Sequence, residues 1–96
     1  MKILALEQER PGVPAEAFAP HLRAEAARVY ELQQNGVLRE IWFRADRSRA
    51  VLVLECLTVE QAREVLRTLP LVKEKLIDFE IIPLKPYPGL ARLFAR

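Results

Sequence analysis

The stretch Leu69–Pro88, LPLVKEKLIDFEIIPLKPYP, decides the fold that we predict for this chain. Pro70 has no N–H group and clashes with a preceding helical turn, so it ends any helix that reaches it. Residues 77–84 alternate charged and apolar side chains before an apolar pair, which predicts a strand. Pro83 cannot donate a hydrogen bond to a neighbouring strand, and we therefore expect this strand at the edge of a sheet.

Upstream of this stretch, the pattern predicts a strand followed by a helix. Residues 2–8 are short and apolar, as in a strand. We expect the helix to begin near Ala19 or Pro20, after a separate turn, and to end at Asn35-Gly36, where left-handed backbone angles are accepted. Its apolar residues recur at steps of three and four, which places them on one helical face: Phe18, Leu22, Ala26, Val29 and Leu32.

The middle of the chain predicts a hairpin and a second helix. Residues 37–44 and 50–57 are strand-like, and the polar segment 45–49 between them is short enough for a hairpin turn. Thr58 followed by Gln61 forms a capping-box pattern, which opens a helix at residues 59–69.

The predicted order is therefore strand, helix, strand, strand, helix, strand within a single domain, residues 1–96. Right-handed crossovers and a central hairpin leave one simple closed arrangement. It is an α+β fold, the ferredoxin-like β-α-β-β-α-β sandwich, with an antiparallel four-stranded sheet in the order 4-1-3-2.

Alternation within the strands predicts two different sheet faces. We expect the helices to cover a uniformly apolar face, formed by Leu4, Leu6, Ile41, Phe43, Leu52, Leu54, Cys56, Phe79 and Ile81. The opposite face is mixed, formed by Ile3, Ala5, Glu7, Glu40, Trp42, Arg44, Val51, Val53, Glu55, Glu80 and Ile82.

The mixed face predicts self-association. Large apolar groups on a solvent-facing sheet usually mark an interface, so we expect this face to pack on its copy in a second subunit. The segment 86–96 is too apolar to remain in water, and we expect it to form an extended tail that packs on the partner subunit.

Composition narrows the class of protein. The chain has 96 residues, 51% of them hydrophobic, and a formal net charge of +2. Its basic residues are spread along the sequence, which does not predict nucleic-acid binding. Cys56 is the single cysteine, so an internal disulfide and a cysteine-based metal site are excluded. We see no signal peptide or membrane-spanning run, and we expect a cytoplasmic protein without a metal or cofactor.

Three short motifs resemble the muconolactone isomerase-like group of the dimeric α/β-barrel superfamily. They are Leu69-Pro70-Leu71, Asp78-Phe79-Glu80 and Pro83-Leu84, followed by Pro88 at the exit. The order of elements is similar over nearly the whole chain. One feature differs, because this chain has Pro86-Tyr87 where the isomerase pattern carries a pair of histidines.

The resemblance implies both an assembly and a reaction. It implies that two ferredoxin-like subunits place their sheets face to face as a dimer or within a larger ring. It also implies a cofactor-free proton shift on a small unsaturated lactone or a related anionic metabolite. A second hypothesis is a non-catalytic homodimeric module for ligand binding or assembly. A third is an oxygenase of the same superfamily, either cofactor-free or haem-dependent.

A proton shift beside a carbonyl needs an acid, a base and a group that stabilises the enolate. Glu40 and Glu55 are the candidate catalytic pair, because the hairpin register can bring them together beside Trp42. Arg44 is a candidate for binding a substrate carboxylate. Trp42, which could stack on a planar ligand, and Glu80 of the same face are further candidates for substrate binding. The alternative is that these charges form salt bridges around a dimer interface.

His21 is the only histidine in the chain. It is a candidate for substrate binding, as an acid or base in a pocket, or for a single axial haem ligand. The alternative is a surface or capping residue, because one histidine does not make a metal-ligand set.

Overall fold

The computed structural model describes residues 1–95, and its elements follow the predicted order. The last residue of the predicted tail, Arg96, lies outside the described residues. The strands and helices are β1 Lys2–Glu9, α1 Leu22–Gln34, β2 Leu38–Phe43, β3 Ala50–Glu55, α2 Val59–Arg67, α3 Pro70–Lys73 and β4 Ile77–Pro83, with 3₁₀ turns η1 Ala15–Ala17, η2 Ala19–His21 and η3 Pro88–Leu93.

The strands form one antiparallel sheet in the order β2-β3-β1-β4, as predicted. This is the ferredoxin-like arrangement, in which β1 and β3 are the two central strands. β4 lies at the edge, and Pro83 ends it opposite Ile3. The predicted fold class is therefore confirmed.

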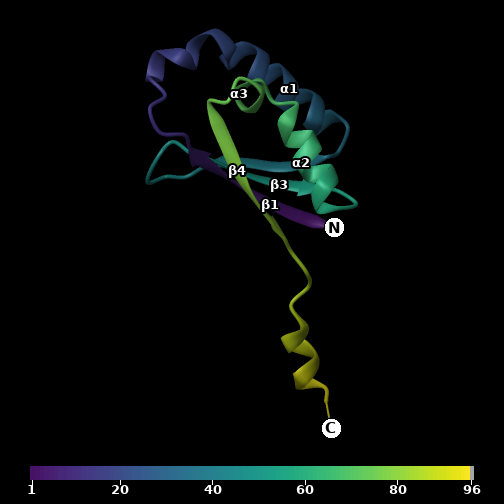
Figure 1. Cartoon of the computed structure of the whole chain (residues 1–96). Helices are drawn as coiled ribbons and strands as arrows, with labels where there is room; N and C mark the ends of the chain where they lie inside the picture. Colours follow the sequence, from purple (N-terminus) through teal and green to yellow (C-terminus); the bar gives the residue numbers. More distant parts are fainter. Residues whose placement is uncertain (96) are drawn as a thin grey trace.

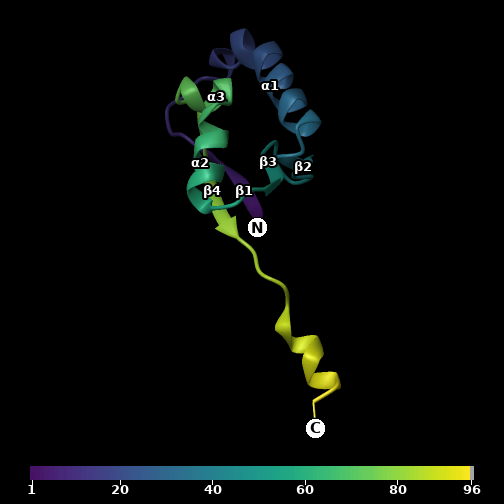
Figure 2. The ribbon, with the colours of Figure 1, turned by 90° about the vertical axis from the view of Figure 1, so that its right-hand side faces the viewer.

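All the helices cover the same face of the sheet (Figure 1). α1 runs over the side that carries β2, whereas α2 and α3 contact β4, and α3 also contacts α1 (Figure 2). The core lies between these two layers. Its buried residues are Ile3, Ala5, Leu32, Leu38, Ala50, Leu52, Leu54, Cys56, Ala62, Leu66 and Leu69.

The predicted orientation of β1 is wrong. Ile3 pairs with Leu54 and Ala5 with Leu52, so the odd-numbered residues of β1 face the helices, and Glu7 lies on their side. Leu4 and Leu6 face the opposite side. Both sets of β1 side chains are apolar, so alternation within this strand did not distinguish them. The other strands face as predicted.

Local signals explain how the helices start. Thr58 caps α2, because its Oγ1 accepts a hydrogen bond of 3.0 Å from the Gln61 N–H, and the Gln61 side chain accepts from the Leu57 N–H. Pro70 follows the end of α2, as predicted, and it also begins the short helix α3. It occupies the first turn of α3, where its missing N–H group has no helical partner to lose.

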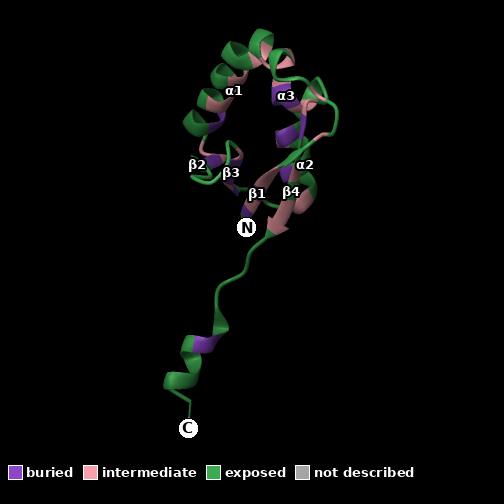
Figure 3. Cartoon of the chain, turned by 90° about the vertical axis from the view of Figure 1, so that its left-hand side faces the viewer, coloured by how far each residue is buried: buried purple, intermediate pink, exposed green. Residues whose placement is uncertain are grey.

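The C-terminal segment leaves the body of the molecule after Pro83 (Figure 1). It gives the chain a longest dimension of 60 Å against 29 and 22 Å in the other directions. Figure 3 shows this segment as almost entirely exposed. Its buried residue is Gly89, which lies against the ring of Tyr87. The exposed apolar residues of the segment are Leu84, Tyr87, Leu90, Leu93 and Phe94.

The core makes a direct prediction about stability. Leu54 is 0% exposed and pairs with Ile3 in the middle of the sheet. We expect Leu54→Ala to lower the free energy of unfolding by about 3 kcal/mol, because the neighbouring strands cannot collapse into the space left. The matched control is Leu57→Ala, since Leu57 is 82% exposed. Urea denaturation of both variants tests this, and equal losses would contradict the assigned core.

Candidate active site

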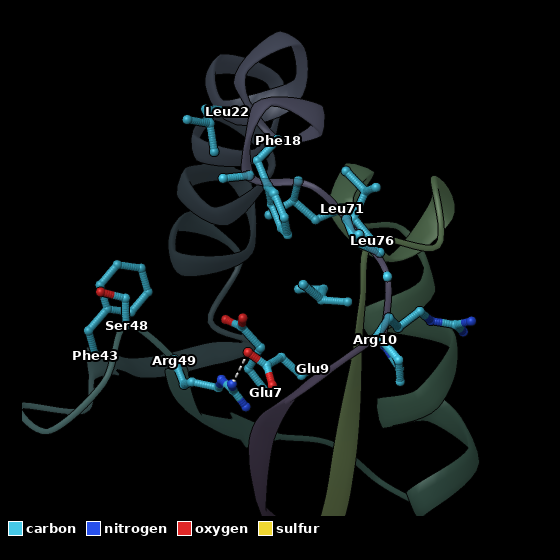
Figure 4. Close-up of a pocket in the computed structure, with 15 residues that line it drawn as sticks. Glu7, Glu9, Arg10, Phe18, Leu22, Phe43, Ser48, Arg49, Leu71 and Leu76 are labelled. Atoms are coloured by element: carbon cyan, nitrogen blue, oxygen red, sulfur yellow. Dashed lines mark ion pairs between the residues drawn. The ribbon is translucent and has the colours of Figure 1, made fainter.

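A cleft lies between α1 and the helix-facing side of the sheet, as two cavities with shared walls. The inner cavity, of about 450 Å³, is bounded by α1, the sheet and α3. The outer cavity, of about 710 Å³, lies where β1 ends and the β2–β3 hairpin turns (Figure 4). Both volumes fall in the range of small-molecule sites. The two cavities share the residues Glu7, Leu22, Phe43, Leu71 and Ile77.

The cleft exists because α1 is only loosely packed on the sheet. Leu32, near its end, is the buried residue of α1. Leu22 and Tyr30 remain 53% and 62% exposed although they line the inner cavity. Most of the apolar face of the helix therefore lines a cavity, and Leu32 is its residue in the core.

Glu25 lies on the wall of the inner cavity and links α1 to α3. Its Oε1 accepts a hydrogen bond of 2.9 Å from the Leu71 N–H. That N–H belongs to the first turn of α3, where backbone donors have no helical acceptor. Leu69, the N-cap residue, makes no side-chain hydrogen bond, so Glu25 supplies an acceptor from another helix.

Burial raises the pKa of Glu25 above the ordinary value of 4.5. The hydrogen bond from Leu71 acts in the opposite direction, and the negative charge of Glu7 adds to the rise. The carboxyl group therefore keeps a proton at a higher pH than a solvent-exposed glutamate does. Partly buried carboxyl groups with a raised pKa suit proton transfer, because they are stronger bases than solvent-exposed carboxylates.

Glu7 lines both cavities, between β1 and β3. Its Oε1 accepts a hydrogen bond of 3.0 Å from the Ala50 N–H at the start of β3. This contact orients the carboxylate on the floor of the cleft. Two carboxyl groups from separate elements, Glu7 and Glu25, thus face one apolar cavity.

The predicted catalytic pair, Glu40 and Glu55, is on the open face of the sheet with separate partners. Glu40 accepts a hydrogen bond of 3.0 Å from Trp42 Nε1. Glu55 binds the N-terminal amine at 3.0 Å, and this hydrogen bond lowers the pKa of Glu55. The structure brings Glu40 and Trp42 together, and both predicted acids are exposed.

The remaining predicted residues are dispersed. Arg44 donates two hydrogen bonds, of 2.9 and 2.6 Å, to Asp46 in the hairpin turn, which lowers the pKa of Asp46. Glu80 pairs with Leu6 across the open sheet face. His21 is the N-cap residue of α1 and makes no capping hydrogen bond through its side chain. None of these residues lines the two cavities.

Glu25 and Glu7 were not predicted as site residues, although the sequence carries a signal for each of them. Glu25 follows Leu22 by three residues and precedes Val29 by four, which places it within the predicted apolar face of α1. Glu7 follows Ile3 and Ala5 at steps of two. An acidic residue that continues an apolar face is a candidate for a site.

Within residues 1–95, no three His, Cys, Asp or Glu side chains gather in a way that could hold a metal ion. Burial raises the pKa of the Cys56 thiol, which opposes formation of a reactive thiolate. Over the same described range, no helix is both long and apolar enough to cross a bilayer.

Comparison with solved structures places this fold among known proteins. A structure of muconolactone isomerase matches with a TM-score of 0.72 and 24% sequence identity, over 93% of each chain. The 5-chloro-2-hydroxyhydroquinone dehydrochlorinase of Burkholderia phenoliruptrix AC1100, in complex with 2,5-dihydroxybenzoquinone, matches with a TM-score of 0.70 and 15% identity. That match covers 93% of this chain and 98% of the other. No curated protein matches the chain.

At these identities the two structures establish the fold and not the reaction. The family model described as muconolactone delta-isomerase matches residues 5–89, which include α1 and every residue that lines the cleft. The chain belongs to the muconolactone delta-isomerase family.

Proposed function

We propose that this protein binds a small cyclic compound in the cleft beneath α1 and moves a proton on it without a cofactor. An unsaturated lactone is the substrate class, in keeping with the family to which the chain belongs. The apolar walls suit a flat ring, and Tyr30 and Gln33 on the wall of the inner cavity offer hydrogen-bond donors for its oxygens.

The observation that carries this proposal is the partly buried carboxyl group of Glu25 beside that of Glu7. As the base, the Glu25 carboxylate takes a proton from the saturated ring carbon next to the far end of the C=C bond that is conjugated with the ring carbonyl. The C–H bond breaks and its electron pair moves toward the carbonyl oxygen, which forms an enolate. The Glu25 carboxylic acid then returns the proton to a different carbon of the conjugated system, and the double bond has moved. Glu7 repels a second negative charge and so favours the protonated form of Glu25.

The open face of the sheet supports a further proposal, that two copies pack face to face. This face carries Trp42, which is 63% exposed, and an apolar patch made of Leu4, Leu6, Val51, Val53 and Ile82. The exposed tail adds more apolar surface that the body of its own chain does not cover. A second copy can cover both apolar surfaces, because in a symmetric dimer each chain presents its patch and its tail to the other chain.

The proton-transfer proposal predicts the effect of Glu25→Gln. Glutamine keeps a carbonyl oxygen for the Leu71 N–H but cannot carry the proton. We expect turnover of muconolactone to fall by about 10²–10⁴-fold, with little loss of stability. The control is Glu31→Gln on the exposed side of the same helix.

The same assay compares the two candidate sites. Glu40→Gln and Glu55→Gln should leave turnover unchanged, because neither side chain lines the cleft. Loss of activity in these variants, with Glu25→Gln active, would move the site to the open face of the sheet.

The raised pKa of Glu25 predicts a pH dependence of stability. The folded protein binds this proton more tightly than the unfolded chain, so the contribution of Glu25 to stability falls as pH rises from 4.5 through the raised pKa. Relative to Glu25→Gln, the wild type should therefore become progressively less stable over that interval. Thermal unfolding of both proteins between pH 4 and pH 8 tests this, and a constant difference in Tm would contradict it.

The assembly proposal predicts the effect of charges on the open face. Light scattering during size exclusion should show a dimer or a larger ring for the wild type. Val53→Lys at the centre of the patch should release monomers, because the lysine would be buried without a partner in the interface. Glu60→Lys, on the exposed surface of α2, is the control. A monomeric wild type would refute the proposal.

A further inference from the structure

Arg49 is a largely buried cation whose counterion is exposed. It precedes β3 and lines the outer cavity. Its Nη2 lies 2.5 Å from Glu9 Oε1, and the side chains of Arg49 and Glu9 are 19% and 78% exposed, respectively. Figure 4 shows this ion pair on the strand side of the cavity, close to Glu7, with the apolar side chains of Phe18, Leu71 and Leu76 opposite.

This asymmetry makes the ion pair exchangeable. A largely buried guanidinium group needs an anion, since removal from water is costly without one. Release of Glu9 from this pair costs little free energy, because an exposed carboxylate is well solvated by water and an ion pair with it contributes little to stability. An incoming carboxylate can therefore replace Glu9 and leave Arg49 compensated. The planar guanidinium group also binds carboxylates through two parallel hydrogen bonds.

Two other arginines near the cleft, Arg44 and Arg10, differ from Arg49 in their ion-pair partners and in their exposure. Arg44 is bound by Asp46 within the hairpin turn and does not line either cavity. Arg10 lines the outer cavity, but it donates to Asp78 at 2.8 Å and its side chain is 40% exposed. Arg10 therefore provides a matched control in the same cavity, with the same charge.

We propose that Arg49 binds the carboxylate of an anionic ligand in the outer cavity, and that Glu9 is an internal competitor displaced by this carboxylate. The inference rests on the proposed function only in that the ligand occupies the cleft. Because Glu7, Phe43 and Leu71 line both cavities, a ligand held at Arg49 extends its ring toward Glu25 in the inner one. Arg49 would thus select acids and set their orientation, without taking part in proton transfer.

The test compares two probes of almost the same shape, muconolactone and its methyl ester, by titration calorimetry. The wild type should bind the acid about tenfold or more tightly than the ester, as expected for a hydrogen bond to a charged group. Arg49→Gln should abolish this preference, whereas Arg49→Lys should keep part of it and Arg10→Gln should keep all of it. Glu9→Gln should tighten binding of the acid several-fold and leave binding of the ester unchanged, since only the acid competes with Glu9.

Three results would overturn the inference. They are equal binding of acid and ester by the wild type, binding of neither, and a preference for the acid that survives Arg49→Gln. If Arg49→Gln fails to fold, the affinities of Glu9→Gln and Arg49→Lys for the acid and the ester still test whether Arg49 binds the carboxylate. Failure of the proposed function is separate, because the same titrations are also made in the Glu25→Gln background, where binding is measured without turnover. If the preference for the acid depends on Arg49 but the protein moves no proton, Arg49 remains the carboxylate-binding residue and the proposed isomerase activity is wrong.

Discussion

The pairing of Ala5 with Leu52 and with Ile81, on either side of the central strand β1, is the constraint on which the rest of the structure depends. It turns the odd-numbered residues of β1 toward the helices. Ile3 and Ala5 then complete the core, and Glu7 follows two residues later beneath α1. A shift of one residue would send Glu7 to the open face and remove one carboxylate from the cleft.

The second constraint is the hydrogen bond between Glu25 and the backbone of α3. It satisfies a donor at the start of a short helix that has no cap of its own, and it ties α1 to α3 across the top of the cleft. The same position desolvates the carboxyl group and raises its pKa. One side chain thus links the docking of α1 on α3 to the proposed chemistry.

The two faces of the sheet serve different purposes in this scheme. The face beneath the helices holds the core, the two carboxylates and, at one end, the ion pair of Arg49 with Glu9. The open face holds an apolar patch flanked by charges that pair locally, such as Glu55 with the N-terminal amine. This separation suits a protein whose ligand site lies within each chain and whose assembly surface lies on the opposite side.

The sequence by itself determined the order of elements and the sheet topology. Pro70, Thr58 with Gln61, Asn35-Gly36 and Pro83 act through their own backbone geometry or through residues a few positions away, so local chemistry is sufficient to recognise them. Only the tertiary structure decided the face of β1 and the members of the cleft. Side chains on both faces of β1 are apolar, and the partners of Glu25 and Glu7 are 46 and 43 residues away in the chain. Contacts of that kind depend on how the helices dock on the sheet, which no pattern within a single segment encodes.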